Sequence, residues 1–224
     1  MKTPTFQEYQ NYTWEKIEPL YQELEERDLT DGNVDEWMTG WSELSNLVDE
    51  RYCRLSLAVD QDTTDEKAEK AFHSFLEEVY PSIKSADQKL KEKLLKSGLE
   101  PEGMELSLKK MRIEAQLFRE ENLLLETEES KLGTEYNKIT GTQSIEWKGE
   151  ELTLDQVKTA LMTDNRSKRK KLWESMAERQ LEDRDAINEL WVKFMGLRKK
   201  QAANADFPDY RAYSWQKRLR LDYT

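Results

Sequence analysis

The sequence has 224 residues, of which 37% are hydrophobic and 36% are charged, and its formal net charge is -11. A chain of this length can bury a substantial core, and its 7 Trp, 9 Tyr and 6 Phe argue against disorder. The negative charge repels nucleic acids and anionic membrane surfaces, so we expect neither as a partner.

The sequence also limits where the protein works. Cys53 is the single cysteine, which excludes an internal disulfide, and the mean hydropathy is -0.95. No apolar signal core follows the first residues, and no run approaches the roughly 20 apolar residues that span a bilayer. These features predict a soluble cytoplasmic protein.

The first part of the chain has the spacing of amphipathic helices. Thr13 can cap one helix, and Asn33, after a break at Asp31-Gly32, can cap a second. The apolar stripes are Ile17, Leu20, Tyr21 and Leu24 in the first helix, and Val34, Trp37, Trp41, Leu44 and Val48 in the second. A short polar turn between them predicts an antiparallel hairpin.

Helical spacing continues to residue 141. Thr63 and Glu66 have the spacing of a capping box, Pro81 should kink or end the helix that follows, and Gly98 suits the left-handed position after a helix end. Two further helices are expected from about Met104, with these apolar positions: Leu108, Met111, Ala115, Phe118, Leu125, Leu132, Tyr136 and Ile139.

The only strand signal lies at residues 144–153, where Ile145 and Trp147 alternate with polar residues before a turn at Lys148-Gly149. We therefore predict a mainly α fold of antiparallel helical hairpins with one small β-hairpin. The predicted divisions are a helical hairpin at 1–58, a helical region at 62–141, the β-hairpin at 142–153, and a helical segment at 154–224.

Two residues invite a catalytic or metal-binding interpretation. His73 has Glu69 and Glu77 one helical turn away on either side, but a lone histidine between phenylalanines is more typical of packing. Cys53 would need a base to act as a nucleophile, and its position near Leu55 predicts a small core residue instead. We assign no catalytic or metal-binding residue.

A basic cluster, Lys168-Arg169-Lys170-Lys171, stands out in this acidic chain. It is a candidate for a nucleic-acid or targeting patch. However, it lies near a predicted helix start, and Glu174 and Glu178 follow at helical spacing. The stronger interpretation is an outer helix face with local ion pairs.

The last segment, residues 197–224, concentrates aromatic and guanidinium groups, which normally bury against other protein surfaces. Its most distinctive constellation is Asp209, Tyr210 and Arg211 with Tyr213. These four residues either hold two lobes together or line a peptide-binding channel, and the sequence leaves both open. We expect the missing partner surface to leave an apolar patch, so that the isolated chain self-associates.

The sequence of this segment resembles that of oligoendopeptidase F and its relatives in the thimet oligopeptidase family of zinc peptidases. The resemblance is carried by Gln201-Ala202, Asn204-Ala205, Phe207, Asp209-Tyr210-Arg211, Tyr213 and Arg220-Leu221-Asp222-Tyr223-Thr224, with looser agreement at Val34, Trp37, Trp41-Ser42, Arg119, Asn122, Tyr136 and Leu152-Thr153-Leu154. One departure is Asp206, where family members usually have glycine.

The resemblance implies an amino-terminal, non-catalytic helical lobe that forms one wall of a channel for short peptides. Such enzymes bind zinc through His-Glu-x-x-His and a further Glu. This chain has one histidine, His73, so a site with two histidines is excluded, and the resemblance places the zinc and the chemistry on an absent catalytic lobe. We expect the chain alone, a fragment of the enzyme in this interpretation, to be inactive.

One alternative from another class remains open. An acidic, all-α scaffold or adaptor protein would bind a partner helix in a groove between its hairpins. Such a protein is expected to end in polar, solvated residues.

Overall fold

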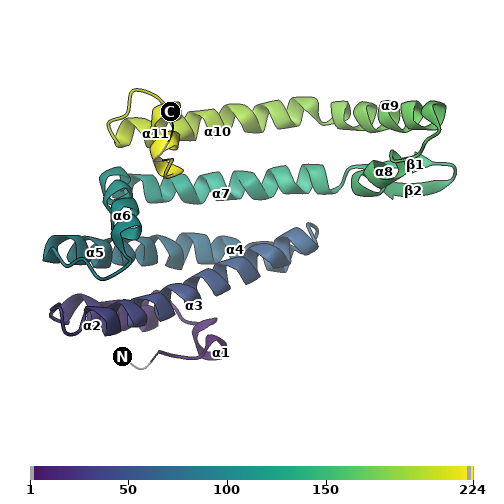
Figure 1. Ribbon diagram of the computed structural model, residues 1–224. Coiled ribbons are helices and arrows are strands. Elements are labelled where there is room, and N and C mark those ends of the chain that lie inside the picture. The colour runs from purple at the N-terminus through teal and green to yellow at the C-terminus, as the bar shows by residue number, and fades with distance from the viewer. Residues whose placement is uncertain (1–2, 221–222, 224) are drawn as a thin grey trace.

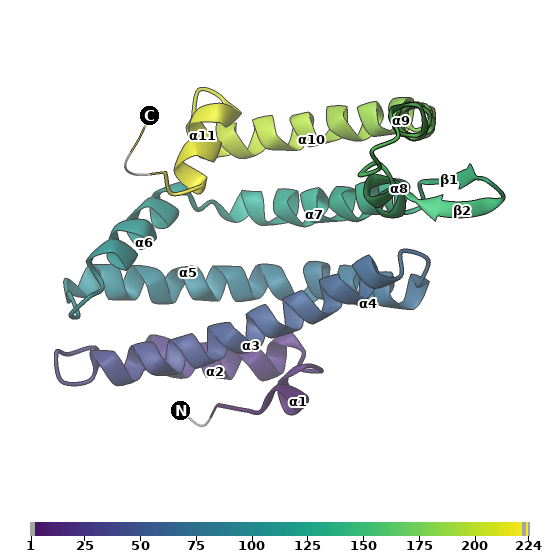
Figure 2. The same ribbon diagram turned by 45° about the vertical axis from the view of Figure 1, so that its right-hand side comes forward.

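The computed structural model describes residues 3–220 and residue 223, and it is a stack of nearly parallel helices (Figures 1 and 2). The amino-terminal layers contain α1 (Phe6–Tyr9), α2 (Trp14–Glu26), α3 (Val34–Gln61), α4 (Glu66–Ser74), a π-helical turn η1 (Phe75–Val79) and α5 (Tyr80–Ser97). The predicted mainly α fold is confirmed.

The carboxyl-terminal layers begin with α6 (Glu105–Leu117), which connects α5 to the next layer at one end of the stack. The elements that follow are α7 (Glu120–Gly141), β1 (Ser144–Trp147), β2 (Glu150–Thr153), α8 (Leu154–Ala160), α9 (Arg166–Glu182), α10 (Arg184–Asn204) and α11 (Tyr210–Lys217). Helix α10 runs along α7, and α11 packs on both α6 and α10.

The largest core lies between α1, α2, α3 and α5. The predicted stripes of α2 and α3 face it: Ile17, Leu24, Trp37 and Leu44 are fully buried, and the Trp37 indole N–H donates to the Leu24 carbonyl at 2.8 Å. Because each helix buries one apolar face in one shared core, spacing alone located these helices correctly.

The β-hairpin is also confirmed. Strands β1 and β2 pair antiparallel, with Ser144 opposite Thr153, and Lys148 and Gly149 both have positive φ angles of 58° and 84°. Two such residues form the tight turn that matches strand twist. Ile145, Val157 and Leu172 then make a small separate core that joins the hairpin to α8 and α9.

The start of α4 differs from the prediction. Thr63 and Glu66 form no capping box; instead, Asp65 is the cap, and its carboxylate accepts hydrogen bonds from the backbone N–H groups of Lys67 and Ala68 at 2.9 and 3.1 Å. A carboxylate at a helix start satisfies free N–H groups and interacts favourably with the helix dipole.

Pro81 neither ends the helix nor leaves it regular. The chain widens into η1 just before it, and the Tyr80 N–H bonds to the Phe75 carbonyl, five residues back. The Leu76 carbonyl would need Pro81 to continue that pattern, and proline has no N–H. The hydroxyl of Thr127 on α7 donates to this carbonyl instead, at 3.0 Å in a buried position.

Cys53 corrects a second prediction, because its side chain is exposed rather than in the core. The apolar stripe of α3 includes Val48 and continues to the half-buried Tyr52 and Leu55. Cys53 follows Tyr52 by one residue, so it points about 100° away from that stripe.

Asp206 forms the turn at the end of α10 in the left-handed conformation, with φ at 62°. The N–H groups of Asp206 and Phe207 bond to the carbonyls of Ala203 and Ala202 at 3.0 and 2.9 Å. This is a Schellman motif, in which glycine is the usual residue at the left-handed position.

We therefore expect the free energy of unfolding of Asp206→Gly to equal or exceed that of the parent chain. Glycine relieves the backbone strain, and this gain offsets the loss of the exposed ion pair between Asp206 and Arg119. Asp206→Ala should lower it by about 1 kcal/mol, because it keeps the strain and loses the pair. Urea denaturation of the three proteins measures the order; alanine ranking with or above glycine would contradict it.

Candidate functional site

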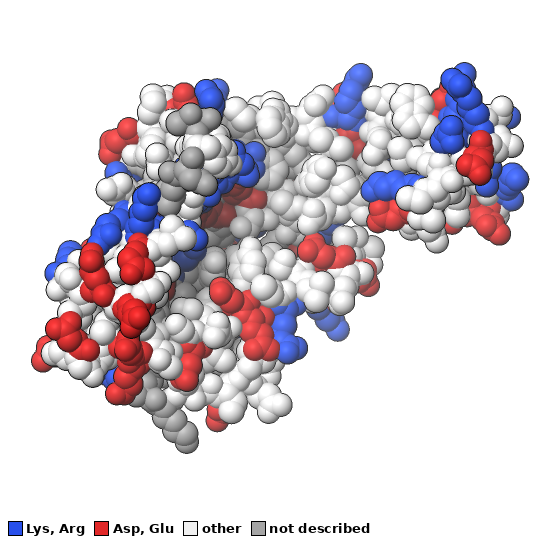
Figure 3. All heavy atoms as spheres, in the orientation of Figure 1, with Lys and Arg blue, Asp and Glu red and all other residues white. Residues whose placement is uncertain are grey.

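Two neighbouring hollows lie between α5 and the layer of α7, α10 and α11, with volumes of about 270 and 500 Å³. Figure 3 shows a recess with both charge signs where these layers meet. Both hollows are lined by Lys84, Leu123, Glu126 and Lys217. We call the two together the α7 groove.

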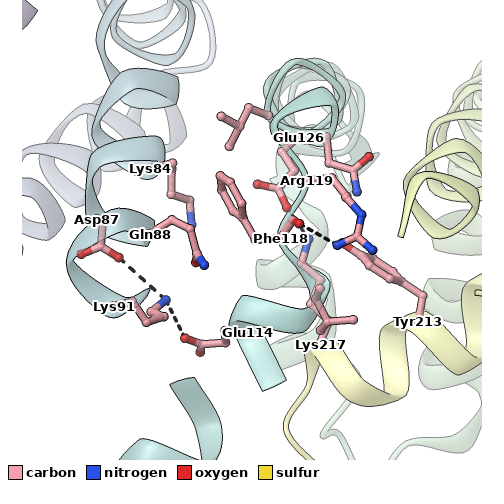
Figure 4. A pocket seen from close by; sticks show the side chains of 13 residues that line it. Lys84, Asp87, Gln88, Lys91, Glu114, Phe118, Arg119, Glu126, Tyr213 and Lys217 are labelled. Atoms are coloured by element: carbon pink, nitrogen blue, oxygen red, sulfur yellow. Dashed lines mark hydrogen bonds and ion pairs between the residues drawn. The ribbon is translucent and has the colours of Figure 1, made fainter. Parts of the chain in front are cut away.

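One wall of the α7 groove comes from α11. The Lys217 ammonium donates to Glu126 on α7 at 2.7 Å and lies 5.7 Å from the centroid of the Tyr213 ring (Figure 4). Burial lowers the pKa of Lys217, but Glu126, Tyr213 and Glu129 together outweigh this, so the pKa is raised overall. Lys217 therefore stays positively charged near neutral pH.

Tyr213 is 3% exposed, and burial is the main cause that raises the pKa of its phenol. Its ring meets Phe207 edge to face, with centroids 5.7 Å apart. The neutral phenol lies in the lining of the smaller hollow, where it offers both a donor and an acceptor.

The opposite wall of the smaller hollow is an ion-pair cluster (Figure 4). Lys91 on α5 lies 2.8 Å from Glu114 on α6 and 3.8 Å from Asp87, and only 14% of its side chain is exposed. Asp87 also accepts a hydrogen bond from the Trp41 indole at 2.7 Å. This cluster fixes α6 against α3 and α5.

A polar seam joins α7 to α10 along the groove. Glu129 accepts hydrogen bonds from Arg198 at 2.7 Å and from the fully buried Gln201 at 2.9 Å. Nearer the start of α7, Asn122 donates to the Gln201 carbonyl and accepts from Asn204. Paired polar groups thus join the two helices along this part of the groove.

The four predicted site residues do not share one location. Tyr213 lines the α7 groove, and the Tyr210 ring packs beside it at a tilt of 39°, with centroids 6.0 Å apart. Asp209 is the cap of α11 and accepts from the Ala212 N–H at 2.8 Å, and with Arg211 it lines a different hollow on the outer side of α11. Tyr213 and Asp209 therefore face different surfaces.

The expectation that the terminal aromatic groups lack cover is wrong for most of the segment. Tyr213 packs against Leu117, Ala202 and Ala205 of this chain, with Phe207 and Tyr210 half-buried around it. Tyr223 is 55% exposed and contacts Trp215. Leu221, Asp222 and Thr224 lie outside the described residues, and self-association stays a prediction.

His73 is half-buried beside Phe72, with ring centroids 6.4 Å apart, and its Nε2 has no hydrogen-bond partner. The flanking carboxylates are engaged elsewhere, Glu69 with Lys138 at 2.6 Å and Glu77 with Lys131. In the described part of the chain, no three His, Cys, Asp or Glu side chains are grouped to hold a metal ion. The residues present therefore do not fit a zinc site.

Sequence reasoning missed the residues of α7. The helix predicted there is confirmed, and Leu125, Leu132 and Ile139 are half-buried in it, although Tyr136 is 44% exposed. The most buried positions are instead the polar residues Asn122, Thr127 and Thr134. Asn122, Glu126 and Glu129 recur at intervals of four and three residues. That polar stripe at helical spacing was the signal that would have found the groove.

Of the helices in the described ranges, none is both long and apolar enough to cross a membrane. A search of curated protein sequences finds no significant match.

Solved structures share this fold over almost the whole chain. An oligoendopeptidase F superposes with a TM-score of 0.86 at 20% identity, over 98% of this chain and 40% of that one. PZ peptidase A, solved with an inhibitor, gives 0.82 at 20% identity over 100% and 39%. An oligoendopeptidase F from Bacillus anthracis str. Ames gives 0.79 at 19% identity over 100% and 41%. The chain thus spans about two fifths of the length of these proteins.

A sequence profile gives the family directly. Residues 6–118, just over half of the chain, match the peptidase M3 N-terminal domain. This match covers the amino-terminal layers and α6, which form one wall of the α7 groove. The chain belongs to the peptidase M3 N-terminal domain family.

Proposed function

We propose that this chain is the non-catalytic, amino-terminal helical lobe of an oligoendopeptidase F-like zinc peptidase that cleaves short peptides. The observation that carries the proposal is the extent of the structural match: 98–100% of this chain superposes on about two fifths of such proteins. This proposal assigns the zinc and the general base to a separate catalytic lobe, because a zinc site with two histidines cannot form in a chain that has one.

Within this proposal, the α7 groove forms the wall that contacts the peptide. Its lining supports that role, because Lys84 and Lys217 can meet peptide carboxylates or carbonyls, and Glu126 can meet N–H groups. Tyr80 and Tyr213 add ring faces with polar tips for side chains and backbone. Mixed polar and aromatic linings suit peptides of varied sequence.

The expected result has two parts. The chain with added zinc does not turn over a fluorogenic oligopeptide, because two zinc histidines are missing. A short unlabelled peptide nevertheless shifts the NMR signals of groove residues, above all those of Lys84, Tyr213 and Lys217.

The control is the isotope-labelled chain with Tyr213→Phe, which keeps the ring and removes the hydroxyl; it should weaken peptide binding without unfolding the protein. Turnover that a chelator abolishes would refute the assignment of the chemistry to another lobe. Shifts confined to surfaces away from the α7 groove would refute the groove as the wall.

A further inference from the structure

The start of α9 carries a concentration of positive charge that the proposed function does not use. Five of the six residues from Arg166 to Lys171 are Lys or Arg, on a chain of net charge -11. They lie at the end of the molecule farthest from α11, beside the β-hairpin, where Figure 3 shows Lys and Arg side chains gathered. We call Arg166, Lys168, Arg169, Lys170 and Lys171 the α9 basic patch.

Few acidic side chains of the folded chain neutralise the charge of this patch. Lys170 lies 3.6 Å from Glu174 but is 73% exposed, and Arg169 donates to the Thr163 carbonyl at 2.7 Å. Within residues 3–220 and 223, the other three cations form no ion pair, and Glu178 forms none with the patch. The prediction of an outer face balanced by Glu174 and Glu178 therefore holds for one pair only.

The patch also opposes a rule of helix stability. The amino end of a helix carries partial positive charge and favours Asp or Glu, yet the first turn of α9 has no acidic residue. Cations there are unfavourable for the fold. Residues that oppose a stability preference, without a compensating contact inside the protein, are expected at functional sites such as binding surfaces.

An apolar feature lies within the same patch. A hollow of about 480 Å³ is lined by Leu161 and Trp173 together with Arg166, Arg169 and Lys170. Trp173 is 58% exposed, and Met162 beside Leu161 is 87% exposed. This part of α9 is anchored to the protein, because Leu172, next to Trp173, is fully buried against Ile145 and Val157.

We propose that the α9 basic patch binds an acidic peptide segment and that one apolar side chain of this segment enters the hollow beside Trp173. Exposed Trp and Arg side chains around a small hollow are the residues that dominate protein interfaces. The cations attract carboxylates, and the indole and Leu161 supply the apolar contact. The site lies apart from the α7 groove and adds a partner that the peptidase role does not require.

A protein segment fits better than a nucleic acid. The basic surface extends over about two turns of one helix, whereas nucleic-acid affinity grows with the number of phosphates that a basic surface neutralises. The acidic remainder of the chain repels a long polyanion. A short acidic segment with one apolar anchor matches both the size and the charge.

The test uses fluorescein-labelled Glu-Glu-Phe-Glu-Glu and fluorescence anisotropy at low salt, with Gln-Gln-Phe-Gln-Gln as the neutral peptide. We expect the acidic peptide to bind more tightly and to lose affinity as salt rises. Trp173→Ala and the double variant Arg166→Gln/Lys170→Gln should each weaken binding by about tenfold. The double variant should melt close to the temperature of the parent chain, because relief of the unfavourable charge of Arg166 in the first turn offsets loss of the exposed Lys170–Glu174 pair.

The matched controls lie on α10. Trp191 is 57% exposed, and Lys199 and Lys200 are exposed, so Trp191→Ala removes an equally exposed indole and Lys199→Gln/Lys200→Gln likewise removes two positive charges elsewhere. They should leave binding unchanged. Equal weakening by these controls, equal affinity for the neutral peptide, or no binding would overturn the proposal, as would tighter binding of an oligouridine through the same residues.

Discussion

Glu129→Ala is expected to lower the free energy of unfolding of the chain by about 2–4 kcal/mol, the largest effect of any single change proposed for this protein. Only 21% of the Glu129 side chain and 26% of the Arg198 side chain are exposed, so the lost pair is poorly replaced by water. Gln201 is fully buried, and its Oε1 already lacks a partner. Without Glu129, its Nε2 would lose its partner as well.

The loss should appear first in α10. The Arg198 guanidinium would keep its contact with the Phe194 ring, 4.8 Å away, but α10 would lose its charged connection to the middle of α7. We therefore expect faster hydrogen exchange of α10 amides in addition to a lower urea midpoint. The exchange pattern separates loss of this seam from general destabilisation.

Glu128→Ala is the matched control for this change. Glu128 is the preceding residue on α7, its side chain is 56% exposed, and it pairs with Lys131 at 3.0 Å on the helix surface. Exposed pairs of this kind contribute about 0.3–0.5 kcal/mol. If the two variants lost similar stability, the polar seam would not be what holds α10 to α7.

The contrast between α2 or α3 and α7 explains which parts of the fold the sequence predicts. Helices α2 and α3 each bury one apolar face, so a period of 3.6 residues identifies both the helix and its inner side. Helix α7 is pressed between two layers and buries Asn122, Thr127 and Thr134. Polar residues at buried positions give no hydropathy signal, so the spacing of Leu125, Leu132 and Ile139 predicts the helix but not its most buried positions.

Of the residues that line the α7 groove, the sequence predicts only Tyr213, because it carries no information about contacts between distant residues. Tyr213 stood out because aromatic and Arg residues cluster around it in the sequence. Its partners are distant, however: Lys217 and Glu126 are 91 positions apart, and Arg198 and Glu129 are 69 apart. A single sequence carries no information about which of 46 acidic residues meets which cation, so these pairs needed the fold.

The same limit applies at η1. Pro81 predicts a disturbed helix, but not that the chain absorbs it in a π-helical turn whose free carbonyl is satisfied from another layer. Thr127 is 6% exposed and joins the layer of α4 and α5 to α7 at the edge of the larger hollow. This hydrogen bond therefore satisfies the Leu76 carbonyl and also holds the two layers together beside the groove.

Thr127→Val tests that bond with almost no change in shape. Valine keeps the branched side chain and removes the hydroxyl, so the Leu76 carbonyl loses its donor in a buried position. Leaving such a group without a partner costs about 1–3 kcal/mol. Urea denaturation should show this loss, and exchange of the amides in η1 should accelerate because the turn is no longer tied to α7.

Thr134→Val on the same helix is the control. Thr134 is 5% exposed, but its hydroxyl lies 3.5 Å from the Ser130 carbonyl, four residues back, which already has the backbone N–H of Thr134 as its helical partner. Its loss leaves no buried acceptor free, so the change should stay within about 0.5 kcal/mol. Equal losses at the two threonines would mean that the π-helical turn satisfies its own carbonyl and that Thr127 contributes only by packing.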